Sequence, residues 1–274
     1  MIAALDIGGT HVSAARVDLD SAAVTARCRL PLAADGSRAE LLEAITHAAT
    51  AVGGIERVGV AVPGPFDYEE GVSRMRHKLA ALDGVSLRDE LATAVGLDGA
   101  AVRFVNDADA FGLGEWWAGA ALGHERVVAI TLGTGLGSAF LEGGRIVRDG
   151  SLHLAPFRGG PVEDVVSRRG LLARYGGNGD LDVEAIAERA RSGEARACET
   201  FAAVFAALAE FLTPWLADFD ATCLVVGGSI ARAWDLIDPV LRPALRSVES
   251  LEVVTAAASI DDAPLLGAAR HAAS

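Results

Sequence analysis

Two short glycine-rich turns carry residues whose types and spacing suit phosphate binding. Gly8-Gly9-Thr10 follows a β-rich run at residues 2–7, and Gly133-Thr134-Gly135 follows another at 126–132. Both turns lead into further β-rich runs, whereas a P-loop leads into a helix whose amino terminus holds the phosphate. In a hairpin, small residues let backbone N–H groups and a threonine hydroxyl approach an anion closely. One such turn is most simply a tight hairpin, but two at mirrored positions predict a pair that grips a polyphosphate.

Three polar side chains near strand ends could serve catalysis. Asp6 stands beside the first turn, where a carboxylate would repel phosphates unless a cation intervened, so it predicts Mg²⁺, held directly or through water, together with ATP. Asn106 and Asp107 stand between a buried strand and a helix. Asp107 is either a simple helix N-cap or a base that accepts a proton from a hydroxyl attacking a γ-phosphate. Asn106 can bond a sugar hydroxyl as donor and acceptor together.

Short strands alternating with helices must position these residues. The predicted strands are 2–7, 12–18, 24–30, 58–62, 102–105, 126–132, 138–142 and 221–226. One predicted helix begins after Ser37, which has Glu40 at capping-box spacing, and another begins after Ser86 and closes near Gly96. Further helices are predicted over 107–118, 161–174, 182–191 and 194–217, from about 230, and after Pro264. This alternation favours an α/β fold, and the repeated order of strand, glycine turn and strand predicts two similarly built lobes.

Composition narrows the classes of function. The 274 residues suit about two domains, and 51% hydrophobic residues with a mean hydropathy of +0.32 indicate an ordinary globular protein. A net charge of −13 and a pI of about 4.9 are opposite to the basic surface that nucleic acid or anionic lipid requires. We therefore expect neither as a partner.

The cysteines and the apolar stretches predict a cytoplasmic protein. Cys28, Cys198 and Cys223 form no C-x-x-C pair, which is typical of a reducing compartment. The first residues show no signal-peptide pattern. The most apolar long stretch, 201–216, contains Glu210 and Pro214 and is shorter than a membrane span, so it predicts a buried helix.

Several motifs together resemble the ROK family (repressors, open reading frames and kinases) of the actin/hexokinase-like superfamily. The matching segments are Asp6-Ile7-Gly8-Gly9-Thr10, residues 59–65, Asn106-Asp107-Ala108 with Gly114-Glu115, residues 132–137 and residues 226–230. The resemblance implies two ribonuclease H-like α/β lobes with a cleft between them. It implies an amino-terminal lobe at 1–105, completed by the last helix at 262–274, and a carboxy-terminal lobe at 106–261.

The resemblance also implies a role for each matching residue. Asp107 would be the base for the 6-hydroxyl of a hexose, with Asn106 and Gly64 beside the sugar. The phosphates of the donor would contact residues of both lobes. Those of the amino-terminal lobe would be Gly8, Gly9 and Thr10, and those of the carboxy-terminal lobe would be Thr134, Gly135 and Gly137. Gly228 and Ser229 would lie by the adenosine.

Two departures from the family pattern put glucose itself in question. Members commonly have Glu-x-Gly-His followed by a cysteine-rich zinc loop that ends in Gly-Cys-x-Glu, and these residues touch the sugar. His153 and Glu163 can be matched, but the first Glu and every zinc-ligand cysteine are absent, so we expect no zinc, as in the zinc-less branch of bacterial glucokinases, some of which use inorganic polyphosphate. A lone histidine such as His153 is more often structural than a ligand.

The second departure is a basic segment. His77-Lys78-Leu79 replaces the family's Pro-Asn-Leu, with Arg74 and Arg76 nearby. This segment is either a solvated loop or a basic cluster that favours binding of an anionic group, a polyphosphate donor or an altered sugar. The second possibility makes an amino sugar or a cyclitol a further candidate substrate.

The resemblance implies an ATP-dependent kinase that phosphorylates the 6-hydroxyl of a glucose-like or amino sugar. The alternatives are a non-catalytic sugar-sensing ROK protein, a cyclitol kinase or an enzyme using polyphosphate; an ATPase of the chaperone or actin kind ranks last. The family's repressors carry an amino-terminal helix-turn-helix, which residues 1–17 do not resemble, so we expect no direct DNA binding. Members are often homodimers, which is an expectation here as well.

Overall fold

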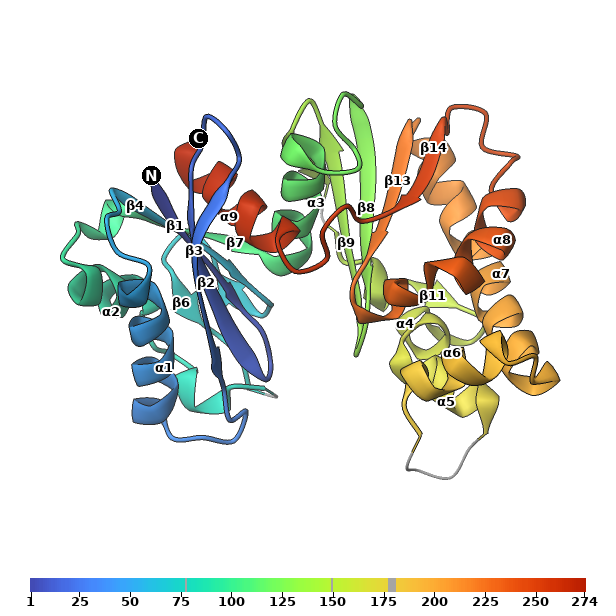
Figure 1. The fold of residues 1–274 in the computed structure, drawn as a ribbon, viewed down its shortest axis with the longest axis horizontal. Helices are drawn as coiled ribbons and strands as arrows, with labels where there is room; N and C mark the ends of the chain where they lie inside the picture. Colours follow the sequence, from blue (N-terminus) through green and yellow to red (C-terminus); the bar gives the residue numbers. More distant parts are fainter. Residues whose placement is uncertain (77, 149, 177–180) are drawn as a thin grey trace. The chain divides into compact units, whose positions relative to one another are not determined.

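The computed structural model describes residues 1–76, 78–148, 150–176 and 181–274, which pack as two compact units (Figure 1). Unit 1 contains Met1–Gly119 and Asp261–Ser274, and unit 2 contains Ala120–Ile260. The carboxy-terminal helix therefore packs with the amino-terminal segment. The contacts also place the helix at 107–118 in unit 1, whereas the sequence analysis assigned it to the second lobe.

Unit 1 is built on a five-stranded mixed sheet in the order β3-β2-β1-β4-β7. Its strands are β1 (Ile2–Ile7), β2 (His11–Val17), β3 (Val24–Pro31), β4 (Arg57–Val62) and β7 (Val102–Asn106). The first three form an antiparallel meander, and β4 and β7 run parallel to β1. Two small strands, β5 (Phe66–Asp67) and β6 (Val72–Ser73), pair with one another.

Capping residues in the local sequence determine where helices of unit 1 begin and end. These are α1 (Arg38–Ala51), α2 (Leu87–Val95), α3 (Asp107–Ala118) and α9 (Ala263–Ala273), with short helices η1 (Ala80–Leu82) and η2 (Gly99–Ala101). The predicted capping box of α1 is confirmed, because Ser37 Oγ accepts from the Glu40 N–H while Glu40 returns to the Ser37 N–H. Gly96 ends α2 in the left-handed conformation, as a C-cap glycine should.

The α3 and α9 helices meet almost backbone to backbone. A Cβ on Gly267 would overlap the carbonyl oxygen of Ala110, and one on Gly114 would overlap that of Ala263. Gly59 of β4 is pressed against Ala268 of α9 in the same way. Because such close contacts run between α3, α9 and the sheet, α3 packs as part of unit 1.

Unit 2 repeats the sheet of unit 1 in the order β10-β9-β8-β13-β14. Its strands are β8 (Arg126–Leu132), β9 (Leu136–Glu142), β10 (Arg145–Arg148), β13 (Cys223–Gly227) and β14 (Val253–Ala256). Again three strands are antiparallel and two follow in parallel. The predicted α/β class with two similarly built lobes is confirmed. The edge strands β10 and β14 were not predicted from the sequence, because four residues are too few to show a periodic pattern.

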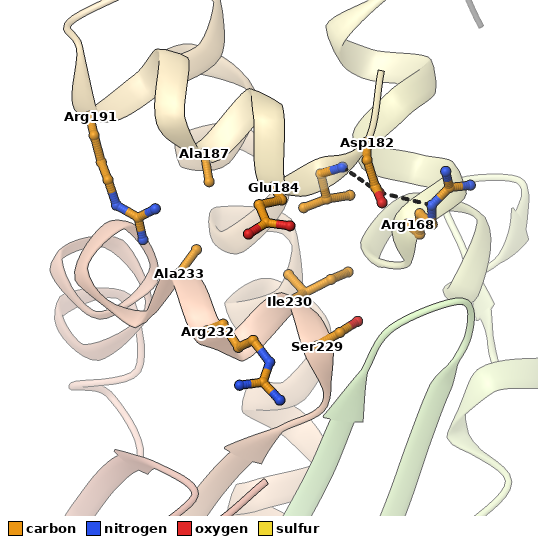
Figure 2. Close-up of a pocket in the computed structure, with 10 residues that line it drawn as sticks. Arg168, Asp182, Glu184, Ala187, Arg191, Ser229, Ile230, Arg232 and Ala233 are labelled. Atoms are coloured by element: carbon orange, nitrogen blue, oxygen red, sulfur yellow. Dashed lines mark hydrogen bonds and ion pairs between the residues drawn. The ribbon is translucent and has the colours of Figure 1, made fainter. Parts of the chain in front are cut away.

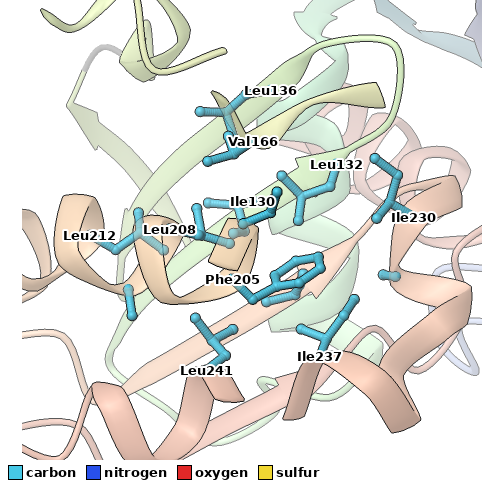
Figure 3. Close-up of a cluster of buried hydrophobic side chains, with 14 of the residues drawn as sticks. Ile130, Leu132, Leu136, Val166, Phe205, Leu208, Leu212, Ile230, Ile237 and Leu241 are labelled. Carbon is cyan, nitrogen blue, oxygen red and sulfur yellow. The ribbon is translucent and has the colours of Figure 1, made fainter. Parts of the chain in front are cut away.

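Five α-helices of unit 2 lie among the described residues. They are α4 (Glu163–Val166), α5 (Arg168–Tyr175), α6 (Val183–Arg191), α7 (Ala195–Asp218) and α8 (Trp234–Ala244). Short pieces complete the unit: η3 (Leu152–Leu154), β11 (Pro156–Phe157), β12 (Gly160–Pro161) and η4 (Ser229–Ala233). In the core, Phe205 and Leu208 of α7 pack with Ile130 of the sheet and Leu241 of α8 (Figure 3).

The long apolar helix predicted from residues 194–217 is α7. By length and composition alone it could cross a membrane, but 56% of its most apolar window is buried inside the structure. Phe201, Phe205 and Leu212 lie in the core of unit 2. The core helix of a globular protein has the same composition, so the expected buried helix agrees with the packing.

The single helix predicted over 161–174 is wrong. The chain breaks between α4 and α5 at Ser167, whose ψ of 179° is extended. The Arg168 N–H leaves the helical pattern and donates to the carbonyl oxygen of Gly133 at 2.8 Å. A hydrogen bond to a distant turn, which no local periodicity reveals, therefore divides the helix.

Candidate active site

The parallel register of unit 1 brings the predicted site residues to one sheet edge. Asp6 of β1 is level with Ala61 of β4, and Val62 is level with Asn106 of β7. Gly64 lies two residues beyond β4 and is joined to Pro65 by a cis peptide bond. Because the carboxyl ends of parallel strands meet at the same edge, Asp6, Gly64 and Asn106 gather there, with Asp107 next along the chain.

Asp6 is an unusual carboxyl group. Partial burial shields the Asp6 carboxyl group from solvent and the charge of Asp107 opposes its ionisation, which together raise its pKa to about 7, although Arg29 acts in the opposite direction. Two neighbouring acids held in this way form a donor set that suits a hard divalent cation, since a positive charge would stabilise both ionised forms. The residues present therefore fit the Mg²⁺ expected from the sequence.

Asn106, and not Asp107, is the N-cap of α3. Its Oδ1 accepts hydrogen bonds from the N–H of Ala108 at 3.0 Å and of Asp109 at 3.4 Å. Asp107 is the first residue of the helix, and its Oδ1 also accepts from the Ala108 N–H at 3.0 Å. The prediction that Asp107 is simply the N-cap of this helix is wrong, because Asn106 occupies the N-cap position.

Tyr68, which was not among the residues predicted from the sequence, holds the side-chain amide of Asn106 from the other side. Its hydroxyl donates to the Val62 carbonyl oxygen at 3.1 Å and accepts from Asn106 Nδ2 at 3.1 Å. Burial raises the pKa of Tyr68 to about 12, so the phenol keeps its proton at neutral pH. No local signal marks Tyr68, because it lies 38 residues from Asn106.

These bonds correct the expected role of the Asn106 amide. With its oxygen committed to α3 and one N–H committed to Tyr68, Asn106 presents a ligand with its remaining N–H alone. The amide therefore cannot act as donor and acceptor together toward one hydroxyl. Its orientation is fixed at both ends before any ligand arrives.

The first glycine turn forms the expected hairpin between β1 and β2. The Gly8 N–H donates to the His11 carbonyl oxygen at 2.9 Å and so serves the turn itself. A Cβ on Gly9 would meet no atom within 4 Å, and Thr10 is exposed with its Oγ1 at 3.1 Å from His11 Nδ1. The open part of this turn is thus Gly9-Thr10.

The second glycine turn forms the corresponding hairpin in unit 2, between β8 and β9, and the side chain of Glu163 stabilises it. Glu163 Oε2 accepts from the Leu136 N–H at 3.0 Å and lies so near Gly135 that a Cβ there would displace it. The Gly133 N–H donates to the Gly135 carbonyl oxygen at 3.0 Å. Thr134 is exposed at the tip, whereas the predicted phosphate contact Gly137 lies within β9, opposite Thr131.

The third glycine pair adjoins this turn. Gly228 has a φ of +81°, and a Cβ there would overlap the carbonyl oxygen of Leu132, so only glycine fits. The Ser229 hydroxyl oxygen would lie 3.5 Å from a Cβ on Gly133. The structure therefore brings Gly133, Gly228 and Ser229 together.

Beside Ser229 lies a pocket of about 300 Å³ that the sequence did not predict (Figure 2). Its lining comes from the start of α5, from the whole length of α6 and from η4, and comprises Arg168, Asp182, Val183, Glu184, Ala187, Arg191, Ser229, Ile230, Arg232 and Ala233. Only Ser229 was a predicted site residue. The other charged side chains of the pocket lie on helical segments whose sequences are typical of a protein surface and do not indicate a site.

The structure describes the two departures from the family pattern in part. His153 is half-buried on η3, which Ser138 fixes by donating its hydroxyl to the carbonyl oxygen of Gly150. Arg76 pairs with Asp83 at 3.2 Å, and Lys78 is exposed. The neighbouring His77 lies outside the described residues. Within residues 1–76, 78–148, 150–176 and 181–274, no group of three or more His, Cys, Asp or Glu is placed to hold a metal.

Comparisons with known proteins find a family and relatives that match nearly the whole chain. The model of the ROK family matches residues 2–274. A glucokinase from Thermotoga maritima is 30% identical over an alignment that covers 97% of this chain and 95% of the relative.

Two solved structures share the fold over nearly the whole chain. A ROK hexokinase from Thermus thermophilus has a TM-score of 0.81 and 26% identity, covering 98% of this chain and 96% of that one. A ROK family glucokinase from Streptomyces griseus, in complex with glucose and AMPPNP, has a TM-score of 0.82 and 24% identity, covering 98% of both chains.

Proposed function

Because this chain belongs to the ROK family, we propose that it is a sugar kinase that transfers the γ-phosphate of ATP to the 6-hydroxyl of a hexose, either glucose or an amino sugar. The observation that carries the proposal is the meeting of Asp6, Asn106 and Asp107 at one sheet edge beside the open Gly9-Thr10 turn. Phosphoryl transfer needs little more from a protein than positioning, charge stabilisation and a base for the attacking hydroxyl.

Asp107 is the proposed base. Its backbone is held at the first position of α3 by the cap that Asn106 supplies, which places Asp107 on a rigid element directly after the carboxyl end of β7. A positioned general base of this kind contributes roughly 10² to 10⁴ in rate. The hydroxyl proton passes to the Asp107 carboxylate as the oxygen attacks phosphorus.

Asp6 is the residue proposed to hold Mg²⁺, directly or through a water. When bound, the cation supplies charge neutralisation for the transferring phosphoryl group and its leaving oxygen. Asp6 itself contributes an ionised carboxylate on the strand that precedes the turn, and its register opposite Ser13 keeps it beside that turn.

The phosphates of the donor are proposed to meet the two hairpin turns. In unit 1 the donors are the backbone and side chain of Gly9-Thr10, since the Gly8 N–H already serves the turn. In unit 2 they are Thr134 and the Gly135 amide, with Ser229 toward the nucleoside. Glu163 supports the second turn by accepting from the Leu136 N–H.

The acceptor is proposed to contact Gly64, the free N–H of Asn106, His153 and Glu163. The family resemblance supports His153 and Glu163, and geometry supports Asn106, because Tyr68 aims its amide. No structural zinc is proposed, as the cysteines that ligate it in relatives are missing from this chain. A homodimer in the cytoplasm is the proposed state of the enzyme.

The test is release of ADP from Mg·ATP across glucose, mannose, glucosamine, N-acetylmannosamine, kanosamine and a cyclitol. Saturable turnover on a hexose, with the product identified as the 6-phosphate by NMR, is the expected result. Binding of a sugar with no turnover on any acceptor would instead identify a sensor, and turnover only on the cyclitol would overturn the choice of a hexose.

A further inference from the structure

Arg88, near the start of α2, binds backbone carbonyl oxygens of two segments that are distant in the sequence. Its Nη2 and Nε donate to the carbonyl oxygens of Glu69 at 2.6 Å and Glu70 at 3.2 Å. Its Nη1 donates to those of Gly99 at 3.0 Å and Val102 at 2.5 Å. Bonds from an ionised donor are stronger than bonds between neutral groups. The Arg88 side chain therefore ties the turn between β5 and β6 to the start of β7.

The turn that Arg88 holds, residues 67–71, carries Tyr68. The two glutamates that bind the guanidinium group directly follow Tyr68 in the sequence. At the end of the turn, the Gly71 carbonyl oxygen accepts from the N–H of Leu87 at 2.9 Å, which fixes the turn to the start of α2 a second time. Any shift of this turn would carry with it the Tyr68 hydroxyl that holds the Asn106 amide.

Aromatic rings connect Arg88 to the same pair of residues by a second route. The Arg88 Cζ lies 5.5 Å from the centroid of the Phe104 ring, within the range of a cation–π contact. The Phe104 ring lies 5.1 Å from that of Phe66, which in turn lies 5.3 Å from that of Tyr68. Phe104 stands two residues before Asn106 on β7. Arg88 thus contacts both segments whose side chains meet in the Tyr68–Asn106 hydrogen bond.

The turn is packed closely between α2 and β7. Gly71 has a φ of +74°, and a Cβ there would lie 2.7 Å from the Phe104 ring and 2.8 Å from the Cβ of Arg88. Only glycine adopts this conformation and leaves this space free. The backbone of the turn therefore has little room to move as long as Arg88 stays in place.

The arrangement of acceptors requires an arginine and not simply a positive charge. Four carbonyl oxygens from two segments surround one guanidinium group, whose planar fork presents five N–H donors in fixed directions. A lysine at this position would carry the same charge on a single atom with three donors, so it could not bind both segments in the same way.

We propose that Arg88 is a positioning residue for the sugar: it holds residues 67–71 against β7 and thereby fixes, through Tyr68, the Asn106 amide that the sugar meets. The inference rests on the proposed kinase function and deepens it by adding a residue that touches neither substrate. Its physical basis is preorganisation, since a ligand binds more tightly when the group that contacts it is already held in place.

Steady-state kinetics on two variants tests the proposal, with the sugar that gives the highest kcat/KM in the ADP-release panel. Arg88→Lys keeps the charge and Arg88→Gln removes it, and both lose the fork. KM for the sugar should rise about fivefold in both, with KM for ATP unchanged, as expected for one weakened hydrogen bond. The control is Arg38→Lys, because Arg38 of α1 donates to a single carbonyl oxygen, that of Ala81, and should leave both KM values unchanged.

A double variant shows whether Arg88 acts through Tyr68. If it does, Arg88→Lys combined with Tyr68→Phe should have the sugar KM of Tyr68→Phe alone, because the link is already broken. If the two residues act independently, the two increases in KM should multiply. The measurement compares the wild type, both single variants and the double variant in one assay.

Fluorine NMR follows Tyr68 directly and needs no turnover. The chain has two tyrosines, Tyr68 in unit 1 and Tyr175 in unit 2, so labelling with 3-fluorotyrosine should give two signals that Tyr68→Phe assigns. Arg88→Lys and Arg88→Gln should shift or broaden the Tyr68 signal and leave that of Tyr175 unchanged. A general loss of stability in a protein that remains folded would move neither signal.

Several results would overturn the inference. They are an unchanged sugar KM in both Arg88 variants, a wild-type sugar KM in Arg88→Lys with a raised one only in Arg88→Gln, multiplying effects in the double variant, or an unchanged Tyr68 signal. The proposed function fails separately: a protein whose Tyr68 signal responds to Arg88 as expected, yet which phosphorylates no sugar, keeps the coupling of Arg88 to Tyr68 and loses the sugar kinase.

Discussion

The Tyr68 hydroxyl accepts a hydrogen bond from Asn106 Nδ2 at 3.1 Å, while the oxygen of the same amide caps α3. Both polar ends of the Asn106 side chain are thus held by the protein. Since Asn106 precedes the proposed base, this pairing links the turn after β4 to the start of α3. Tyr68 is accordingly a positioning residue that acts through Asn106.

Tyr68→Phe removes the hydroxyl while keeping the ring packed against Phe66, whose centroid lies 5.3 Å away. We expect KM for the sugar to rise severalfold with KM for ATP unchanged, because Asn106 Nδ2 loses its partner and the amide can rotate. Steady-state kinetics with each substrate varied checks this. A uniform loss of protein stability with both KM values unchanged would show that Tyr68 only packs the fold.

Asp107→Asn keeps the size of the side chain and abolishes its basicity. We expect turnover to fall by at least about a hundred-fold, in line with the loss of a general base, while nucleotide affinity stays near that of the wild type. Turnover and calorimetric ATP binding measured on the same preparation test both parts. Substantial residual turnover would remove Asp107 from the mechanism.

The raised pKa of Asp6 predicts a pH dependence of stability. The folded-state pKa of about 7 exceeds the ordinary 3.8, so the folded protein binds more protons than the unfolded chain between these values. The contribution of Asp6 to the free energy of unfolding therefore falls as pH rises from about 4 to about 7 and is constant above that. Thermal melting of the wild type and Asp6→Asn across this range measures the difference.

The wild type should lose melting temperature relative to Asp6→Asn as pH increases through this window. Saturating Mg²⁺ at pH 7.5 should restore part of the lost melting temperature of the wild type, because the cation stabilises the ionised carboxylate and binds only the folded state. Parallel melting curves for the two proteins at every pH would show that Asp6 titrates normally.

Glu163 could support the second glycine turn or bind the sugar, and steady-state kinetics distinguishes these two roles. If it mainly braces the second glycine turn, Glu163→Ala should raise KM for ATP about tenfold, whereas Glu163→Gln, which keeps an acceptor for the Leu136 N–H, should stay near the wild type. Should both variants instead raise KM for the sugar alone, Glu163 would be the sugar ligand that the family resemblance implies.

The close contact of α3 with α9 predicts a large effect of a small substitution. Gly267→Ala would drive a methyl group into the carbonyl oxygen of Ala110 and should destabilise the protein by about 1–3 kcal/mol or more. Gly99→Ala is the control, because its added methyl would make only ordinary contact with Arg88 at 3.5 Å. Urea unfolding followed by circular dichroism compares the two; equal stabilities would mean that the helices can separate at little cost.

The sequence alone determined the local structure and the class of fold. The capping box of Ser37 and Glu40, the Gly96 stop and the two glycine hairpins depend on residues a few positions apart, and each is found as predicted. The repeated order of strands around Gly8-Gly9 and Gly133-Gly135 likewise predicted two similar lobes. Short-range steric and hydrogen-bonding preferences are sufficient for these features.

Only the tertiary structure decided how distant residues act on one another. The bond from Tyr68 to Asn106, the mutual repulsion of Asp6 and Asp107, and the hydrogen bond that breaks a helix at Ser167 all join segments brought together by strand register and packing. The pocket beside Ser229 arises the same way, because its lining comes from α5, α6 and η4, which are separate in the sequence. Periodicity shows which face of an element is buried, but not which distant side chain meets it there.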